Sequence, residues 1–334
     1  MKIDQLNIRP KDLHNEYLSL LAKEIREFFF DPKSNGLKQE IAVWVNCPAC
    51  DSSDFKHYFS KQGLQLHTCG QCGLVFMNPR PNENSMSEFF SNSEALNIYS
   101  EMVEITNAFR TQMIFIPLAD FILQNFGAGE GRKLIEVGCG SGLLLDAIAK
   151  KNNGWELKGI EPSGGAVEIC NSKGLDVYHG GMQEFEGIAE YDLVVFWAVF
   201  DHFFHPYSII KKAHSLLKSG GSILIGSMNI EGFDSMVLGD DNEAFTLPER
   251  QNFFGETSMT AMINRAGFKN VLVTTTGKLD VNIIKEYWQG GGKNGRTHFL
   301  EQLVLGSTSK STAFQEFLMK NNLSGHMTVS ATKQ

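Results

Sequence analysis

The sequence predicts an α/β fold, in which a parallel sheet is flanked by helices, from three observations. First, residues 133–137 form a short aliphatic and β-branched run typical of a buried strand, and Leu143 begins a segment with helical spacing. Second, three glycines lie between this strand and this helix, where the backbone can turn and a ligand can approach it. Third, residues 156–162 have the pattern of another strand. Strand, glycine loop, helix and strand therefore follow in the order of a doubly wound sheet.

The spacing of the glycine loop indicates which ligand such a sheet holds. Glu136 and the glycines give the order E-x-G-x-G-x-G, whereas a dinucleotide site prefers G-x-G-x-x-G. This order resembles motif I of the class I methyltransferases that depend on S-adenosylmethionine (SAM). The resemblance implies that the loop amides and the helix dipole hold the methionine carboxylate, Glu136 the amino group and Glu161 the ribose. The implied cofactor-binding residues are Glu136, Gly138, Cys139, Gly140, Gly142, Glu161, Pro162, Gly181, Met182 and Trp197.

Three later segments extend this resemblance. Residues 192–196 form a buried-strand pattern, and residues 197–202 form a hydrophobic stretch ending in Asp-His, where the family often has Glu-His. Residues 216–225 resemble the family's helix, Gly-Gly turn and fifth strand, and residues 325–331 resemble its last strand. The implied fold is a Rossmann-like class I methyltransferase sheet of seven strands, the last one antiparallel between strands five and six. Any other doubly wound sheet with a tight first turn is the alternative.

Composition limits the partners of this chain. Thirty Lys and Arg against 38 Asp and Glu give a net charge of −8, so no broad basic surface for nucleic acid is expected, although a local patch stays open. The N-terminus lacks a charged-then-apolar signal sequence, and no apolar run approaches the ~20 residues that span a bilayer. We therefore expect a cytoplasmic protein with a small-molecule substrate and no membrane partner.

Four of the six cysteines form two C-x-x-C pairs separated by the 18 residues 51–68. Such knuckles place four thiolates around Zn²⁺, and this separation falls within the range of a zinc ribbon. There are two alternatives. One is a reduced remnant that holds no metal, and the other is redox chemistry at the thiols. A closed set of four ligands predicts a zinc ion that stabilises the fold and does not catalyse. The predicted ligands are Cys47, Cys50, Cys69 and Cys72, whereas Cys139 and Cys170 lack metal spacing.

Residues 73–81, which follow the second knuckle, narrow the resemblance further. With the cysteine pairs, they resemble zinc-ribbon methyltransferases of sugar and polysaccharide biosynthesis, including deoxysugar C-methyltransferases. The resemblance implies a sugar or nucleotide-linked sugar as acceptor. The C-methyltransferases usually carry a large extra C-terminal domain and a Tyr/Glu/His set, and this chain departs on both counts because Glu249-Arg250 stands where Glu-His is expected. Arginine cannot serve as a base at neutral pH, so methylation at oxygen is favoured over that mechanism.

The chain is predicted to have four parts. Residues 1–40 form a helical arm with an amphipathic helix over 12–30, residues 41–82 the zinc ribbon, and residues 83–130 a helical linker with a break at 91–93. Residues 131–334 form the SAM-binding domain, with a helical insertion at about 281–323. We expect the linker to cover the cofactor, unless its aromatic residues are core and its arginine is solvated. The lid candidates are Phe89, Phe90, Tyr99 and Arg110.

Two histidines after the fourth strand are the candidate bases. An alcohol attacks poorly until its proton is removed, and a histidine with a near-neutral pKa suits that task. His202 and His205 lie at the carboxyl edge of the sheet, and Asp201 either orients His202 or replaces the family's Glu. A structural role for His202 is the alternative, and the three residues together are a further metal candidate.

The predicted function is methyl transfer from SAM to a hydroxyl of a small polar acceptor. Two other classes stay open at this stage. One is a nucleic-acid or protein methyltransferase that grips its substrate with the zinc ribbon. The other is a SAM-binding interaction protein without catalysis. The sequence does not define the oligomeric state.

Overall fold

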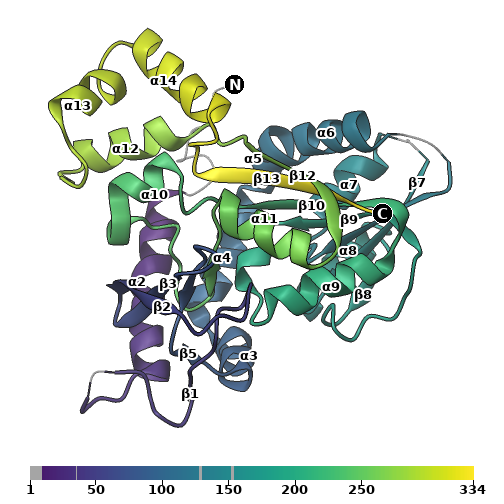
Figure 1. Cartoon of the computed structure of the whole chain (residues 1–334), viewed down its shortest axis with the longest axis horizontal. Helices are drawn as coiled ribbons and strands as arrows, with labels where there is room; N and C mark the ends of the chain where they lie inside the picture. Colours follow the sequence, from purple (N-terminus) through teal and green to yellow (C-terminus); the bar gives the residue numbers. More distant parts are fainter. Residues whose placement is uncertain (1–9, 35, 128–129, 152–153) are drawn as a thin grey trace.

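The computed structural model describes residues 10–34, 36–127, 130–151 and 154–334. Its centre is a seven-stranded sheet in the order β12-β13-β10-β9-β6-β7-β8 (Figure 1). The strands are β6 (Arg132–Val137), β7 (Trp155–Glu161), β8 (Val177–His179), β9 (Tyr191–Trp197), β10 (Leu217–Met228), β12 (Phe268–Thr275) and β13 (His326–Lys333). Strand β13 pairs antiparallel with both β10 and β12, whereas β10, β9, β6, β7 and β8 pair parallel. The predicted fold class, including the antiparallel last strand, is confirmed.

Alternate residues of the central strands face two separate helical layers. Val194 and Phe196 belong to the core under α9 (Pro206–Leu216) and α11 (Glu256–Arg265). Leu193 and Val195 belong to the core under the second layer. That layer consists of α6 (Ile116–Phe126), α7 (Leu143–Ala149) and α8 (Gly164–Ser172). Because both faces are covered, β9 has a continuous apolar run over residues 193–197, as is typical of a buried parallel strand.

The predicted N-terminal helix is present as α2 (Lys11–Phe29). Its buried residues recur at intervals of four, a spacing that places them on one face: Tyr17, Leu21, Ile25 and Phe29. This face packs in a cluster that also contains Met86, Leu66 and Phe245. The helix therefore joins segments that are far apart in the sequence.

The two cysteine pairs lie in a segment that we call the cysteine module, residues 42–81. It contains β1 (Ala42–Val43), β2 (Phe55–Lys61), β3 (Leu64–Cys69), β4 (Val75–Met77) and β5 (Arg80–Pro81). Strands β1 and β5 pair with each other, and β2, β3 and β4 form a second small sheet. The fourth strand of that sheet is β11 (Asn252–Phe253), which pairs antiparallel with β4. The module therefore shares a sheet with a segment from far along the chain.

Helices follow the module, and Ser93 divides the first two of them. They are α3 (Glu83–Asn92), α4 (Glu94–Ile105), α5 (Asn107–Arg110) and the π-helical turn η1 (Thr111–Phe115), which leads into α6. The Ser93 side chain accepts a hydrogen bond from the amide of Leu96 and so begins α4. The predicted break at 91–93 is confirmed.

The lid candidates differ in their surroundings. Phe89 is 2% exposed and stacks with Phe28 and Phe29, so its prediction as a lid residue is wrong. Phe90 is exposed, and Tyr99 contacts the ring of Tyr17. The Nε atom of Arg110 donates to Thr106 Oγ1 at 2.8 Å. A lid role therefore stays a prediction for Phe90, Tyr99 and Arg110 alone.

Helices from the last third of the sequence form a group of their own, in which α14 lies against β12 of the main sheet (Figure 1). It contains α10 (Phe233–Leu238), α12 (Asp280–Gln289), α13 (His298–Val304) and α14 (Thr308–Lys320). These helices share their own apolar cluster, which includes Phe233, Ile284 and Trp288. Two short 3₁₀ turns, η2 (Phe200–His202) and η3 (Gly239–Asp241), complete the described elements. Among the described residues, no helix has the length and apolar character needed to span a membrane.

Candidate active site

The glycine loop after β6 has a backbone that only glycine adopts easily. Gly138, Gly140 and Gly142 have φ angles of +69°, +53° and +74°. A Cβ atom at Gly138 would lie 2.7 Å from Val199, and one at Gly142 would lie 2.9 Å from the Cys170 sulfur. At Gly140, a Cβ atom would meet no atom within 4 Å. The loop is therefore packed against protein at two glycines and open at the middle one.

Most amides of this loop are already bonded within the protein. The amides of Gly138 and Cys139 donate to Ile160 O at 2.8 and 3.2 Å, and that of Gly142 donates to Cys139 O at 2.9 Å. The amide of Gly140 donates to Glu161 Oε2 at 2.8 Å. The prediction that the loop amides as a group hold a carboxylate is therefore wrong for these four. Among the described residues of this region, the backbone amides that remain available to a ligand are those of Ser141 and of the first turn of α7.

Two carboxyl groups stand beside this loop. Glu136 is 3% exposed, and its Oε2 atom has no hydrogen-bond partner among the described residues. Burial, and then the charge of Glu161, raises the pKa of Glu136 well above its usual value. Glu161 is fixed by the amides of Gly140 and Ser163 at 2.8 and 2.9 Å. An ammonium group would satisfy the unpaired oxygen of Glu136. SAM carries such an ammonium group at its methionine end.

The other predicted cofactor residues are not all oriented towards a ligand. Cys139 is buried with its sulfur against Gly159, and Met182 is 2% exposed within the main core. Both side chains therefore pack in the interior, and the cofactor contacts of these two residues stay predictions. The carbonyl of Pro162 lies 3.2 Å from His179 Nε2, and the amide of Gly181 donates to Glu184. Their cofactor contacts stay predictions.

Trp197 ends β9 and is partly buried. Its ring lies over Gly226, where a Cβ atom would come within 2.3 Å of it, and its centroid is 5.3 Å from that of His326. Glycine at 226 is therefore required for the tryptophan to lie flat on the sheet edge. Trp197 and His326 form one wall of the edge at which β9, β10 and β13 meet.

Asp201 follows this edge and is fully buried. Its Oδ1 atom accepts from Ser227 Oγ, and its Oδ2 atom accepts from Arg250 Nη1 at 2.8 Å. Burial raises the pKa of Asp201, and the Arg250 charge opposes that rise. Among the described residues, no hydrogen bond joins this carboxylate to His202, so the structure does not support the prediction that Asp201 orients His202. Asp201 instead orients Arg250.

His202 is partly buried, and its ring makes no side-chain hydrogen bond with the described residues. Burial, and then the charge of Arg250, lowers the pKa of His202 to about 3. His205 is exposed and lies 3.9 Å from Glu83 Oε2. The four cysteines are the one group of metal-ligating residues found in the described chain, so the metal alternative for Asp201, His202 and His205 is contradicted.

Two residues of this edge were missed from the sequence. Arg250 was considered only as a substitute for a base, whereas it forms the buried ion pair with Asp201. His326 begins β13, and burial, followed by the charge of Arg250, lowers its pKa to about 4. A signal for His326 existed, because an antiparallel last strand starts where the parallel strands end. The first residue of that strand therefore lies at the ligand-binding edge.

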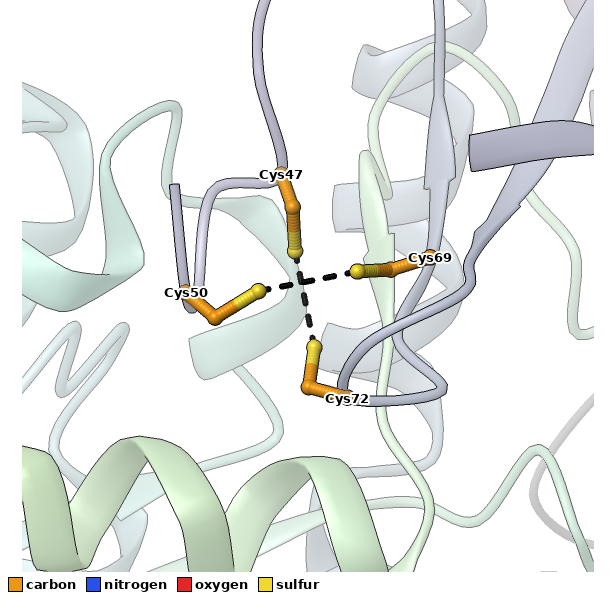
Figure 2. A group of neighbouring side chains, drawn as sticks. All are labelled: Cys47, Cys50, Cys69 and Cys72. Atoms are coloured by element: carbon orange, nitrogen blue, oxygen red, sulfur yellow. Dashed lines mark hydrogen bonds between the residues drawn. The ribbon is translucent and has the colours of Figure 1, made fainter. Parts of the chain in front are cut away.

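The cysteine knuckles converge on one point. The sulfur atoms of Cys47 and Cys72 are 3.5 Å apart, as are those of Cys50 and Cys69, and all four lie within 4.8 Å of one another. Figure 2 shows the four side chains pointing at a common centre from two turns of the chain. Tetrahedral zinc thiolates have Zn–S distances of about 2.3 Å, which separate neighbouring sulfur atoms by roughly 3.8 Å. The donor set therefore fits one tetrahedral cation.

Parts of this chain are similar to known methyltransferases. A family model described as "Methyltransferase domain" matches residues 110–273. The chain is 32% identical over 122 residues to a ubiquinone biosynthesis O-methyltransferase of Methylococcus capsulatus, which covers 34% of this chain and 50% of that protein. The ubiquinone biosynthesis O-methyltransferase of Acinetobacter baylyi is 24% identical over 184 residues, which cover 51% of this chain and 76% of that protein. The chain thus matches about half the length of the first relative.

A solved structure agrees with the fold. The phosphoethanolamine N-methyltransferase 2 of Haemonchus contortus, in complex with SAM, has a TM-score of 0.50 at 16% identity, covering 78% of this chain and 62% of that one. The fold is therefore Rossmann-like and of the methyltransferase type, and the domain match and relatives support an enzyme that depends on SAM. The relatives are named for ubiquinone biosynthesis, so the predicted likeness to sugar-biosynthesis enzymes gains no support from them.

Proposed function

We propose that this chain transfers a methyl group from SAM to a hydroxyl group of a small polar molecule. The observation that carries the proposal is the unpaired, buried Oε2 of Glu136 beside the open side of Gly140. These features fit the ammonium end of SAM at the sheet edge where such folds bind ligands. The relatives are named as O-methyltransferases, which favours oxygen as the acceptor atom.

Each residue of the cofactor side has a proposed role. SAM, when bound, supplies a methyl group on a sulfonium. The acceptor oxygen would attack the methyl carbon in line with the carbon–sulfur bond that breaks. Glu136 accepts hydrogen bonds from the ammonium, and Glu161 accepts them from the ribose hydroxyls. Ser141 and the first turn of α7 donate amides to the carboxylate. Positioning by these fixed groups supplies most of the catalytic effect.

The acceptor side binds the hydroxyl group in this proposal. The ring of His202 is unprotonated at neutral pH because its pKa is about 3, so it is free to accept a hydrogen bond from the hydroxyl. So low a pKa makes His202 a weak base, and its main effect is to orient the attacking oxygen, with the proton passing to it as the oxygen–carbon bond forms. The ion pair of Asp201 and Arg250 holds the neighbouring backbone, and Trp197 with His326 forms the wall.

The finer identity of the acceptor is also a proposal. A sugar or nucleotide-linked sugar offers hydroxyl groups, and the resemblance of the sequence at about residues 43–81 to zinc-ribbon sugar methyltransferases favours it. The relatives' names support a different small molecule with a hydroxyl group. The net charge of −8 supports neither a nucleic acid nor another polyanion.

We further propose that the four cysteines hold a structural zinc ion. Four thiolates occupy every position of a tetrahedral ion, so no position is open for a substrate or water. The sulfur atoms lie within 4.8 Å of one another, and three of the four cysteines are buried. The ion would hold the two knuckles together and take no part in methyl transfer.

Titration calorimetry tests the proposal directly. Purified protein is titrated with SAM, with S-adenosylhomocysteine and with NAD. Micromolar binding of the first two, without binding of NAD, is the expected result. Tight binding of NAD without SAM would overturn it. Protein that binds SAM is then incubated with labelled SAM and either sugar nucleotides, phenols or an extract. Label on RNA or protein would favour a macromolecular substrate, and binding without turnover would favour a non-catalytic role.

A further inference from the structure

The segment Asn78-Pro79-Arg80, which the proposed function does not use, ends at a fully buried arginine. Arg80 Nε donates to Met77 O at 3.2 Å, within the cysteine module. Arg80 Nη1 donates to Phe204 O at 3.1 Å and to Gln251 Oε1 at 3.3 Å. Its guanidinium also lies 5.0 Å from the centroid of the Phe204 ring. One side chain therefore connects three segments of the chain.

Two of these segments carry the acceptor side of the candidate site. Phe204 follows Asp201 and His202 closely, and Gln251 follows Arg250. The amide of Gln251 donates to Asp201 O at 3.0 Å, and the amide of Met77 donates to Gln251 O at 2.9 Å. The acceptor-side segments, residues 201–204 and 249–252, are thus bonded to each other and to β4.

A second bond strengthens this connection. Asn252 Nδ2 donates to Phe203 O at 2.7 Å, while the backbone of Asn252 pairs with Phe76 in the β4–β11 ladder. The module therefore contacts the acceptor side through the β4–β11 backbone pairing and through the hydrogen bonds of the Arg80 guanidinium. By contrast, the loop around Gly140 is bonded to β7, and among the described residues no hydrogen bond joins it to the module.

The charge of Arg80 also indicates coupling to the cysteines. No carboxylate lies within 4.0 Å of Arg80 among the described residues, and its Nη2 atom has no partner. A buried cation without an anion is costly. Burial lowers the pKa of Arg80 to about 9, and the charge of Cys47 opposes this decrease. Four thiolates around one divalent cation carry a net negative charge, so a loaded site would balance the guanidinium.

We infer that Arg80 is a positioning residue that couples the cysteine module to the acceptor side of the methyl-transfer site. The module then serves to fix the acceptor-side segments and not to grip a macromolecule. This inference rests on the proposed function, because it takes these segments as the place where the acceptor binds. It assigns to Arg80 and the end of the cysteine module a role in positioning the acceptor. Binding of the cofactor does not require this role.

The test compares two full-length variants, Arg80→Met and Arg265→Met. Arg265 is a matched control, because its Nη1 donates to Ala49 O at 2.7 Å and its guanidinium lies over the Tyr207 ring. It joins the module to helices α11 and α9, and none of its hydrogen bonds or ring contacts in the described structure reaches the acceptor-side segments. Hydrogen exchange is measured by mass spectrometry on peptides that contain the acceptor-side segments and on peptides that contain the glycine loop. SAM affinity and zinc content are measured on the same samples.

For Arg80→Met, we expect about tenfold faster exchange in the acceptor-side segments, because two charged hydrogen bonds are lost there. Exchange in the glycine loop and the SAM dissociation constant should stay within about twofold of the native values. Arg265→Met should leave the acceptor-side segments protected. Equal protection of these segments in Arg80→Met and native protein would overturn the inference, as would equal loss in both variants. Failure of native protein to bind SAM would instead overturn the proposed function.

Two further measurements apply if Arg80→Met does not fold. Arg80→Lys keeps the charge without the fork, so it should restore folding and give exchange between native and Met levels. In native protein labelled with ¹³C-histidine, chelation of the metal should release the acceptor-side segments before the glycine loop, and the ring signals of His202 should then titrate nearer to pH 6.5. Release of the glycine loop first, or unchanged titration of His202 after metal loss, would contradict coupling through the module.

Discussion

The two sides of the candidate site are built from the chain in different ways. The cofactor side comes from β6, β7 and the loops directly after them, within about thirty residues of sequence. The acceptor side combines the end of β9, the segment before β11, the start of β13 and Arg80 of the cysteine module. One side is therefore local and depends on backbone conformation, whereas the other depends on long-range contacts.

This difference predicts that the two sides respond separately to mutation. The glycine loop is fixed by the positive φ angles of its glycines and by amide bonds to Ile160 and Glu161. The acceptor side is fixed by the Asp201–Arg250 ion pair and by bonds to the module. Changes to the module or to the ion pair should therefore affect acceptor binding, while SAM binding persists.

The largest effect is expected from loss of a knuckle ligand. Cys69→Ser should lower the zinc content from one ion per chain to near zero and the melting temperature by roughly 10 °C or more, because metal binding contributes directly to folding energy. Metal analysis and differential scanning calorimetry check this. The control is Cys170→Ala, a buried cysteine outside the cluster. A native melting temperature in metal-free Cys69→Ser would show that the module folds without the ion.

The next effect is expected from the buried ion pair. Arg250→Met leaves Asp201 without its cationic partner, and breaking such a pair costs about 3–5 kcal/mol of unfolding free energy. The double variant Asp201→Asn/Arg250→Met should cost less than the sum of the single variants, because the uncompensated charge is absent. Denaturant unfolding gives these values, and calorimetry should show SAM affinity within about threefold of native. A large loss of SAM affinity in Arg250→Met would mean that the two sides are not separate.

Local features of the fold could be predicted from the sequence, whereas long-range contacts could not. The glycine spacing and the order of apolar runs specify strands, turns and a cofactor edge within short windows. For this reason the break at Ser93 was predicted correctly, and the resemblance that these short windows carry implied the seven-stranded sheet. The pairing of β11 with β4 joins segments about 175 residues apart, and no periodicity in either segment indicates the other.

The same reason explains the errors in the site. The adjacency of Asp201 and His202 in the sequence suggested a pair, but the carboxylate points to Arg250 and Ser227 from distant segments. Phe89 was placed in a lid because aromatic residues near a cofactor segment resemble one, but the helix buries it against α2. In both cases the direction of a side chain depends on what packs against it, and a single sequence does not contain that information.

A smaller effect is expected on the cofactor side from Glu136→Gln. Loss of a hydrogen bond to a charged group costs about 1.5–3 kcal/mol, so SAM should bind roughly 10- to 150-fold more weakly. Because burial raises the pKa of Glu136, its carboxyl group takes up a proton readily, and native affinity should fall as the pH is lowered. The Gln variant should lack this dependence. Calorimetry between pH 6 and 9 tests both effects, and weaker binding with an unchanged pH dependence would mean that another group holds the ammonium.

The smallest effect concerns His326, one of the histidines of the acceptor side. The pKa of His326 is lowered to about 4 by burial and by the charge of Arg250, against a usual value near 6.5. The unfolded chain therefore takes up a proton at this residue below about pH 6.5, whereas the folded protein does so only near pH 4. Folding stability should fall as the pH drops through this window and level off below it.

For this single residue, the loss between pH 7 and pH 5 should be about 2 kcal/mol, since each pH unit below the unfolded pKa contributes about 1.4 kcal/mol. His326→Asn removes the titrating group, so its stability should fall less over the same interval. His298→Asn is the control, because the side chain of His298 is 88% exposed and should show the native dependence. Urea unfolding at several pH values measures the difference. If His326→Asn lost as much stability as the native chain, the ring would be solvated in the folded state, and the acceptor side would be open to water where the structure places it against Trp197.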